Sequence, residues 1–217
     1  MTKVWEYQNS DGEYEIHQIP YGKNCFSYLI SSHKIAISID PGDGEAIEKI
    51  LEQEGLKLDA ILLTHHHKAH VEDAEFLKEK RGATIIGPKH EELEFLDQEV
   101  FDEDECLISP FTVKVLGLPG HTLDHLGYYF PECKALFSGD ALFLGGCGKM
   151  LEGDEVEYFE SLQKILRLPN DTLIFGGHNI LGEITLRTLE EEVKVNPFLQ
   201  ATSALEFLRV RNEVDQR

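Results

Sequence analysis

The sequence has no long hydrophobic run, and its cysteines are few and scattered. No Cys-x-x-Cys pair occurs among Cys25, Cys106, Cys133 and Cys147. Disulfide-dependent secreted domains carry closely spaced cysteines, so this pattern indicates a reduced chain, and we expect a cytoplasmic location. No apolar stretch approaches the ~20 residues of a transmembrane helix. The N-terminal segment lacks the apolar core of a signal peptide, so we expect no secretion signal.

Positive charge is also scarce. The 217 residues include 40 Asp and Glu but 20 Lys and Arg, which gives a net charge of −20. This balance argues against nucleic acid or an anionic membrane as a partner. An anionic ligand would need a local basic site. The hydrophobic content of 41% and charged content of 28% are ordinary for a globular protein, and the length fits one large domain with at most a small appendage.

The motifs of nucleophilic catalysis are missing too. No Gly-x-Ser-x-Gly sequence occurs. Cys147 lies in a glycine-rich loop, Gly145-Gly146-Cys147-Gly148, but nothing in the sequence indicates that its thiol is activated. The sequence therefore gives little support for hydrolysis by a serine or cysteine nucleophile.

Histidine, in contrast, is concentrated in residues 64–70, directly after an apolar run at residues 60–63. An expression tag would be terminal, and a solvated loop explains one histidine better than four. His65 and His67 are two positions apart, which places both side chains on one side of an extended backbone. Neutral imidazole is the commonest metal ligand in proteins. We therefore predict a metal site at the end of a strand.

Three further ligand-type residues follow predicted strands: His121, Asp140 and His178. His121 alone is compatible with a turn, and Asp140 alone with a cap, but their regular placement favours a shared site. Three histidines leave a tetrahedral metal one open position, which is the catalytic arrangement. The residues expected in this first site are His65, His67 and His121. Asp140 is suited to bridge to a second metal held by His70 and His178.

The remaining histidines are interpreted as non-ligands. His125 is a candidate for orienting the site through hydrogen bonds, and His66 and His90 are assigned no metal role. His17 and His33 are expected at the surface.

The hydrophobic pattern predicts groups of strands separated by helices, typical of a layered α/β protein with two packed sheets. Strands are expected at residues 14–19, 25–30, 35–39, 58–63, 84–86, 111–115, 126–130, 135–138 and 173–175. Helices are expected at residues 43–55, 71–82 and 156–166, and from Glu183 to the end with a break at Asn196-Pro197.

Seven motifs, in order along almost the whole chain, resemble the metallo-β-lactamase superfamily and, within it, the glyoxalase II (hydroxyacylglutathione hydrolase) family. The glycine-cysteine-lysine motif narrows the resemblance towards thiolester and glutathione chemistry. The motifs are Ile39-Asp40-Pro41-Gly42-Asp43, Ile61-Leu62-Leu63-Thr64-His65-His66-His67, Pro119-Gly120-His121-Thr122, Phe137-Ser138-Gly139-Asp140-Ala141-Leu142-Phe143, Gly145-Gly146-Cys147-Gly148-Lys149, Gly177-His178 and Asn196-Pro197-Phe198-Leu199.

The resemblance implies an αββα sandwich over residues 1–180 and a shortened helical segment over residues 181–217. It also implies a metal site, usually with Zn2+ and sometimes with Fe or Mn. The implied reaction is hydrolysis of S-D-lactoylglutathione to D-lactate and glutathione, a step of methylglyoxal detoxification. The implied roles are His65, His67 and His121 on one metal, His70 and His178 on the other, Asp140 as the bridge, and Lys149 and Arg209 on glutathione.

The chain departs from the family pattern at several positions. Ala69 replaces an aspartate that ligates the second metal, so we expect one firmly held metal and a weakened second site. Asn179-Ile180 replaces a Glu-Tyr pair, and Asn212 replaces a lysine, which bears on glutathione binding. Asp73, one helical turn beyond His70, is a candidate substitute ligand, although an exposed helix acid is the better interpretation.

Two alternatives remain open. One is a mononuclear-iron persulfide dioxygenase, which shares the fold and needs fewer ligands. The other is a pseudoenzyme or binding protein that keeps the fold without turnover.

Overall fold

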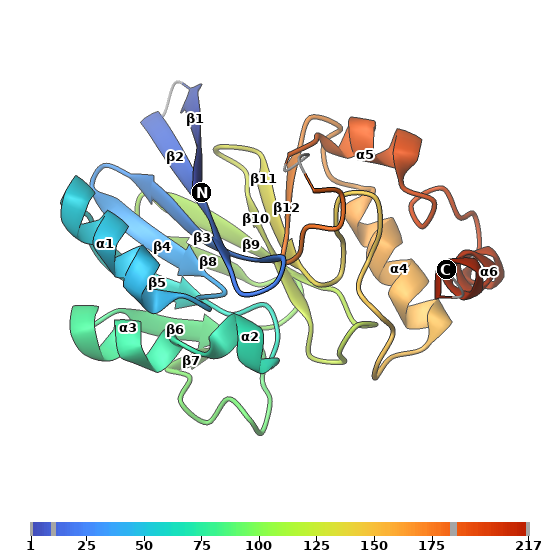
Figure 1. Ribbon diagram of the computed structural model, residues 1–217, viewed down its shortest axis with the longest axis horizontal. Helices are drawn as coiled ribbons and strands as arrows, with labels where there is room; N and C mark the ends of the chain where they lie inside the picture. The colour runs from blue at the N-terminus through green and yellow to red at the C-terminus, as the bar shows by residue number, and fades with distance from the viewer. Residues whose placement is uncertain (1, 10–11, 183–185, 216–217) are drawn as a thin grey trace.

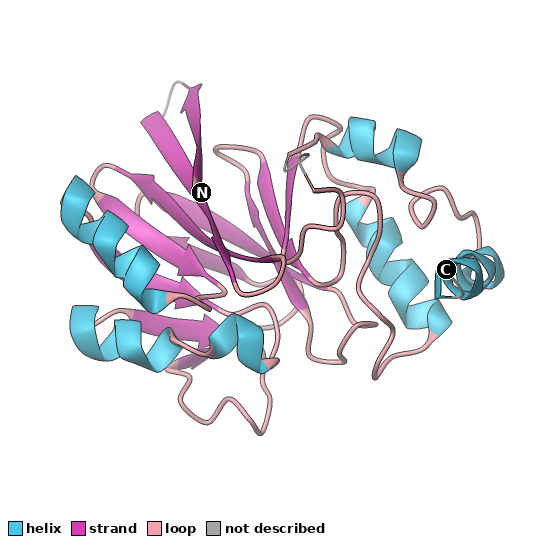
Figure 2. Cartoon of the chain, viewed as in Figure 1, coloured by secondary structure: helices cyan, strands magenta, loops and turns pink. Residues whose placement is uncertain are grey.

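The chain folds into two β-sheets packed face to face, with helices on both outer faces (Figure 1 and Figure 2). The computed structural model describes residues 2–9, 12–182 and 186–215. This is the αββα sandwich predicted from the sequence. The first sheet has the strand order β1 (Lys3–Asn9), β2 (Gly12–Tyr21), β3 (Cys25–Ser32), β4 (Ile35–Ile39), β5 (Lys57–Leu62), β6 (Thr84–Gly87) and β7 (Gln98–Glu99).

Three helices cover the outer face of the first sheet: α1 (Gly44–Glu54), α2 (Lys68–Val71) and α3 (Ala74–Arg81). Helix α1 begins where predicted, because the Asp43 side chain accepts a hydrogen bond from the Ala46 N–H. It ends at Gly55, which adopts the left-handed conformation that glycine reaches without strain. The strands flanking α1, β4 and β5, pair in parallel, as a helical crossover requires.

The second sheet has the strand order β12 (Leu173–Gly176), β11 (Ala135–Gly139), β10 (Leu126–Phe130), β9 (Phe111–Gly117) and β8 (Glu105–Ile108). Helices α4 (Glu155–Ile165), α5 (Leu189–Val195) and α6 (Ala204–Asp215) lie on its outer side. Leu189, Phe198 and Phe207 from the C-terminal segment are buried in one apolar cluster with Leu162 of α4. This segment therefore packs on the sandwich and shares a core with it.

The main core lies between the two sheets. Tyr28 of β3, Phe137 of β11 and Phe175 of β12 meet there, with ring centroids 5.1–5.5 Å apart. Alternate residues of each strand face this layer, which is how two packed sheets form a common core. The packing fixes the strand ends from which the site loops start.

Several details differ from the sequence prediction. The helix expected over residues 71–82 is two helices, because the chain turns at residues 72–73 between α2 and α3. Strands β1, β7 and β8 were not predicted; β7 has only two residues, too few for a periodic pattern. The C-terminal helical pattern predicted from Glu183 was too long, because α5 begins at Leu189 and α6 only at Ala204; residues 183–185 lie outside the described residues.

His17 is not at the surface as expected: its exposed fraction is 3%, and Nε2 lies 3.3 Å from Glu54 Oε2. It sits on the face of β2 that packs towards α1.

Candidate metal centre

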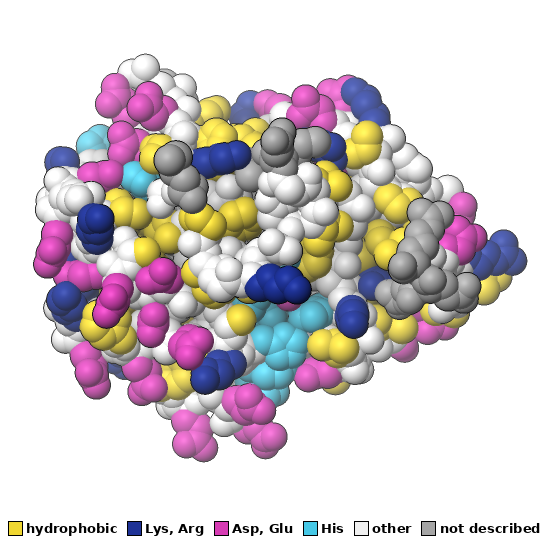
Figure 3. Space-filling view, viewed as in Figure 1, with side chains coloured by type: hydrophobic (Ala, Val, Ile, Leu, Met, Phe, Trp, Pro, Cys, Tyr) yellow, Lys and Arg dark blue, Asp and Glu magenta, His cyan; other side chains and the backbone are white. Residues whose placement is uncertain are grey.

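The predicted ligands converge at one edge of the sandwich, in loops that follow strands of both sheets. Residues 65–70 follow β5, while His121, Asp140 and His178 lie in the loops after β9, β11 and β12. Figure 3 shows histidine side chains gathered in a patch near the middle of this face. Because strand ends of two sheets meet here, residues more than 100 positions apart in sequence lie side by side.

Three imidazole nitrogens point at one another in the first group. His65 Nε2 lies 3.0 Å from His67 Nδ1, and His67 Nδ1 lies 3.1 Å from His121 Nε2. Asp140 Oδ2 lies 3.4 Å from His121 Nε2. Nitrogens bound tetrahedrally at about 2.0–2.1 Å are about 3.3 Å apart, so these spacings match the ligand set of a zinc-sized cation.

The protonation of these imidazoles also suits a cation. Burial lowers the pKa of His65, His67 and His121, and the neighbouring imidazoles lower the pKa of His65 further. His121 Nδ1 lies 2.7 Å from the Lys149 carbonyl oxygen, so Nδ1 donates and the Nε2 lone pair faces the site. Neutral rings with free lone pairs are the form that binds metal.

A second group shares Asp140. His70 Nε2 lies 3.4 Å from Asp140 Oδ1, and His178 Nε2 lies 3.2 Å from Oδ2. Asp140 Oδ1 is buried without a hydrogen-bond partner. Burial opposes ionisation of Asp140, but His70, His178 and His121 outweigh it and hold its pKa well below the usual range. A buried carboxylate with an unsatisfied oxygen between two histidine groups fits a bridging metal ligand.

His125 contacts the backbone of Asp140. Its Nε2 accepts a hydrogen bond from the Asp140 N–H at 3.0 Å, and its ring stacks on that of His65. Both contacts agree with the supporting role expected for His125.

Asp40, which the sequence analysis named only as part of a family motif, holds the histidine loop in place. Its Oδ1 accepts from the Thr64 N–H at 2.8 Å, and its Oδ2 accepts from the Thr64 hydroxyl at 2.7 Å. Oδ2 also lies 2.9 Å from His70 Nδ1, which leaves His70 Nε2 facing Asp140. Asp40 has φ +49°, a left-handed conformation that aspartate tolerates. In the sequence, only its position directly before Pro41 distinguished Asp40 from other aspartates.

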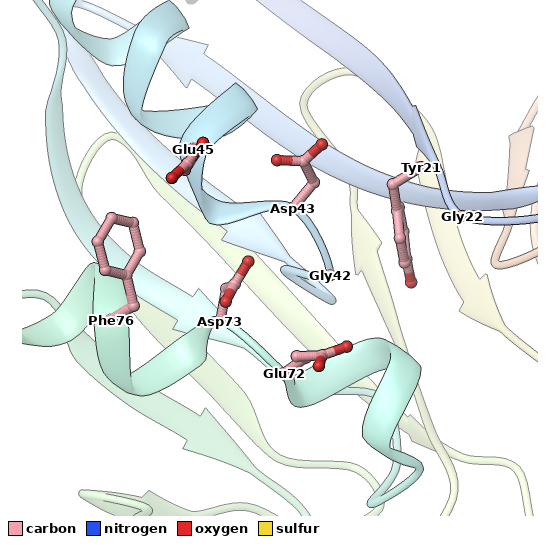
Figure 4. Close-up of a pocket in the computed structure, with 8 residues that line it drawn as sticks. All are labelled: Tyr21, Gly22, Gly42, Asp43, Glu45, Glu72, Asp73 and Phe76. Carbon is pink, nitrogen blue, oxygen red and sulfur yellow. The ribbon is translucent and has the colours of Figure 1, made fainter.

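No carboxylate takes the place left by Ala69 in the described part of the chain. The Ala69 carbonyl accepts a hydrogen bond from the Tyr21 hydroxyl at 2.5 Å. Asp73 belongs to none of the clustered donor groups among these residues. Figure 4 shows the Asp73 carboxylate directed to the first turn of α1, where it accepts from the Gly44 N–H at 2.6 Å. Asp73 is therefore no metal ligand here, but it is partly buried and bonded to α1 and is not the exposed helix acid favoured from the sequence.

His66 and His90 stack on each other next to the two donor groups, with ring centroids 3.7 Å apart. His66 Nδ1 lies 3.1 Å from Asp124 Oδ1. These histidines lie beside the ligand groups and belong to neither.

A cavity of about 360 Å³ opens over the donor groups. Lys149 lines it together with His121, Asp140 and His178. A second cavity of about 590 Å³ lies beside it, lined by Lys149, Leu208, Arg211 and Asn212 among others.

Arg209 is exposed and lines neither cavity. Leu208, Arg211 and Asn212 are spaced i, i+3 and i+4, so they present one face of α6, and Arg209 points away from it. The structure therefore brings Lys149 to the site and leaves Arg209 outside.

A model of the metallo-beta-lactamase superfamily matches residues 20–178. The chain belongs to this superfamily. A hydroxyacylglutathione hydrolase of Brucella anthropi is 45% identical over 168 residues, which are 76% of this chain and 65% of the relative. One of Chromohalobacter salexigens is 42% identical over 175 residues, or 79% and 67% of the two chains. The resemblance to glyoxalase II is thus confirmed, and the chain spans about two thirds of these relatives' length.

Two solved structures have a fold similar to that of this chain. ETHE1 from Myxococcus xanthus superposes with a TM-score of 0.80 at 25% identity, over 98% of this chain and 91% of the other. TTHA1623 in a di-iron-bound form superposes with a TM-score of 0.70 at 29% identity, over 84% and 99%. Fold and donor set together support a divalent metal at this centre.

No helix in the described ranges is long and apolar enough to cross a membrane.

Proposed function

We propose that the protein is a metal-dependent thiolester hydrolase of the glyoxalase II type, acting on S-D-lactoylglutathione or a related acyl-thiol. The observation that carries the proposal is the convergence of His65, His67, His121 and Asp140 beside a cavity lined by Lys149. In this reaction, water adds to the thiolester carbonyl carbon, the carbon–sulfur bond breaks, and the acid and the thiol are released.

Each residue has a defined task in this proposal. His65, His67 and His121 would hold the first cation, and Asp140 would be shared with a second site at His70 and His178. A bound divalent cation acidifies water and polarises a thiolester carbonyl at neutral pH. The Asp140 carboxylate would orient the water, since its pKa is held low and it is therefore ionised at neutral pH.

The cation is proposed to be zinc, with iron or manganese as substitutes in the same donors. The first site has four donors, whereas the second has only His70, His178 and the shared Asp140. With Ala69 in place of a carboxylate, we expect one firmly held cation and a weaker second one.

Lys149 is proposed to bind the anionic glutathione portion of the substrate. In a chain of net charge −20, an anion needs a local positive group at the site entrance. Lys23 lines the same cavity and adds to this positive charge.

We propose a cytoplasmic location for the protein. None of the four cysteines, all within the described residues, forms a disulfide, which suits a reducing cytoplasm.

A persulfide dioxygenase with one iron is the second candidate. The superposition on ETHE1, with a TM-score of 0.80, favours it. A site with one complete donor set and one deficient set also favours it.

The two candidates are separated by one pair of assays on the purified protein. Zinc-loaded protein should hydrolyse S-D-lactoylglutathione. The hydrolysis is measured as the loss of thiolester absorbance. Iron-loaded protein should consume no oxygen with glutathione persulfide. Oxygen uptake without thiolester hydrolysis would overturn the hydrolase proposal in favour of the dioxygenase. Absence of both activities in metal-loaded protein would leave a binding protein.

A further inference from the structure

Cys147, in the glycine-rich loop after β11, contacts an arginine of the C-terminal helix. Arg211 Nη2 on α6 lies 2.8 Å from Cys147 Sγ. The arginine is deeply buried, with 4% of its surface exposed, while the cysteine remains partly exposed. The sequence motif had left this thiol without a role.

Arg211 forms no ion pair with a carboxylate in the part of the chain that the structure describes. It is enclosed by the rings of Tyr158, Phe198 and Phe207, whose centroids lie 4.7–5.4 Å from its Cζ. Its Nε is buried without a hydrogen-bond partner. A guanidinium stays protonated, and burying a cation without a counter-ion is unfavourable, although the rings offset part of that cost. The site therefore favours an anion next to Arg211.

The other acidic groups around the loop are already engaged. Glu192 on α5 accepts from the Gly145 N–H and pairs with Arg187 at 3.0 Å. The Tyr158 hydroxyl lies 3.1–3.2 Å from three backbone carbonyl oxygens, and burial raises its pKa well above the usual value. Lys149, in the same loop, contributes positive charge. The sulfur is thus the group left to supply the negative charge.

We propose that Arg211 holds Cys147 as a thiolate, and that Cys147 is the reactive thiol of this chain and a site of covalent modification. A thiolate attacks an electrophile or a disulfide directly. With iodoacetamide, a carbon–sulfur bond forms, the carbon–iodine bond breaks and iodide leaves. Burial raises the pKa of the other three thiols, Cys25, Cys106 and Cys133, so they serve as internal controls.

Modification of Cys147 would reach the metal centre through two neighbouring backbone groups. The Gly148 N–H donates to the Asp140 carbonyl at 2.9 Å, and the Lys149 carbonyl oxygen lies 2.7 Å from His121 Nδ1. An adduct on Sγ displaces this segment and with it the orientation of His121. The proposal concerns the thiol and holds whichever reaction the centre catalyses.

The test is the pH dependence of iodoacetamide labelling of each cysteine, followed by mass spectrometry of the peptides. An ordinary thiol with a pKa of about 8.5 is ~1% ionised at pH 6.5. We expect Cys147 of the intact protein to label at pH 6.5 at least about tenfold faster than Cys25. Arg211→Met should slow Cys147 at least about tenfold at pH 6.5 and leave its rate at pH 9.5 unchanged. Arg209→Met, an exposed arginine on the same helix, is the matched control and should change neither rate.

The proposal would be overturned if the labelling rate of Cys147 rises only above pH 8 and is the same in Arg211→Met as in the parent protein. That result would show that Cys147 is a neutral thiol. If Arg211→Met fails to fold by circular dichroism, the pH profile of the intact protein still decides. Loss of metal in proportion to labelling of Cys147 would support the coupling to His121. Full labelling with the metal retained would refute that coupling alone.

Discussion

His121 Nδ1 lies 2.7 Å from the backbone carbonyl oxygen of Lys149. A proposed metal ligand is thus oriented by the backbone of the residue proposed to bind the substrate. Lys149 also lines the cavity above the ligand. Because one loop serves both tasks, changes at its side chain and at its backbone should have separable effects.

Replacing His121 with alanine should release the first metal. The variant loses one of four converging donors, so we expect less than half an equivalent of metal after dialysis, measured by mass spectrometry. Metal at 100-fold above its Kd stabilises the folded state by about 3 kcal/mol, so chelation should lower the melting temperature of the parent but not of His121→Ala. His90→Ala is the control and should keep its metal. Retained metal in His121→Ala would contradict the ligand assignment.

Ala69→Asp should strengthen the second metal site. Loss of even an outer partner of a metal ligand changes affinity about 10–100-fold, so restoring a direct ligand should raise second-site affinity by at least that much. We expect metal content to rise from one towards two equivalents, with faster thiolester hydrolysis. Ala69→Asn has the same shape without the charge and should give a smaller rise. Equal metal content in all three proteins would show that the second site does not depend on this position.

Asp40→Asn should weaken both the fold and the site. Asparagine tolerates the left-handed backbone at this position, but it loses the charge that holds Thr64 and His70. Hydrogen bonds to charged groups contribute about 1.5–3 kcal/mol, so urea unfolding should show a loss in that range. Asp43→Asn, which keeps a helix cap, is the control and should lose less than about 0.5 kcal/mol. Unchanged stability of Asp40→Asn would show that the histidine loop is held by other contacts.

Because of the Glu48–Arg81 pair, the free energy of unfolding should vary with pH in the acid range. Glu48 of α1 accepts two hydrogen bonds from Arg81 of α3, at 2.5 and 2.7 Å. These bonds lower the pKa of Glu48 below its ordinary 4.5. Its stabilisation is therefore present above pH 4.5 and is lost as pH falls through the lower folded pKa. Glu48→Gln should cost about 1–2 kcal/mol at pH 7, a difference that shrinks towards pH 3 in thermal melts. A pH-independent difference would point to packing alone.

Lys149→Ala should raise the KM for S-D-lactoylglutathione several-fold and change kcat less. The lysine supplies positive charge at the cavity, while its backbone still orients His121. The effect should fade at high ionic strength, because salt screens exposed charges. Lys114→Ala, an exposed lysine on β9, is the control. A fall in kcat with unchanged KM would place Lys149 in the chemical step instead.

The amino-acid sequence predicted the fold class and most of the residues of the candidate donor groups. Apolar alternation specifies a strand wherever it occurs, so β2 to β6 and β9 to β12 were predicted near their observed bounds. The histidine run identified His65, His67 and His70, because four imidazoles within six residues at a strand end are typical of a metal site. Asp43 and Gly55 marked the ends of α1, since a cap acts within a few residues of itself. Short strands such as β7 carry too little pattern to be predicted.

Only the tertiary structure decided how distant residues act together. Asp40 lies 24 positions from Thr64, and Arg211 lies 64 positions from Cys147; no local pattern links either pair. Burial of His17 and exposure of Arg209 follow from which face of a strand or helix meets its neighbour. Such contacts arise when sheets and helices pack, because hydrogen bonds and ion pairs depend on distance in space, whereas periodicity reports only on neighbours along the chain.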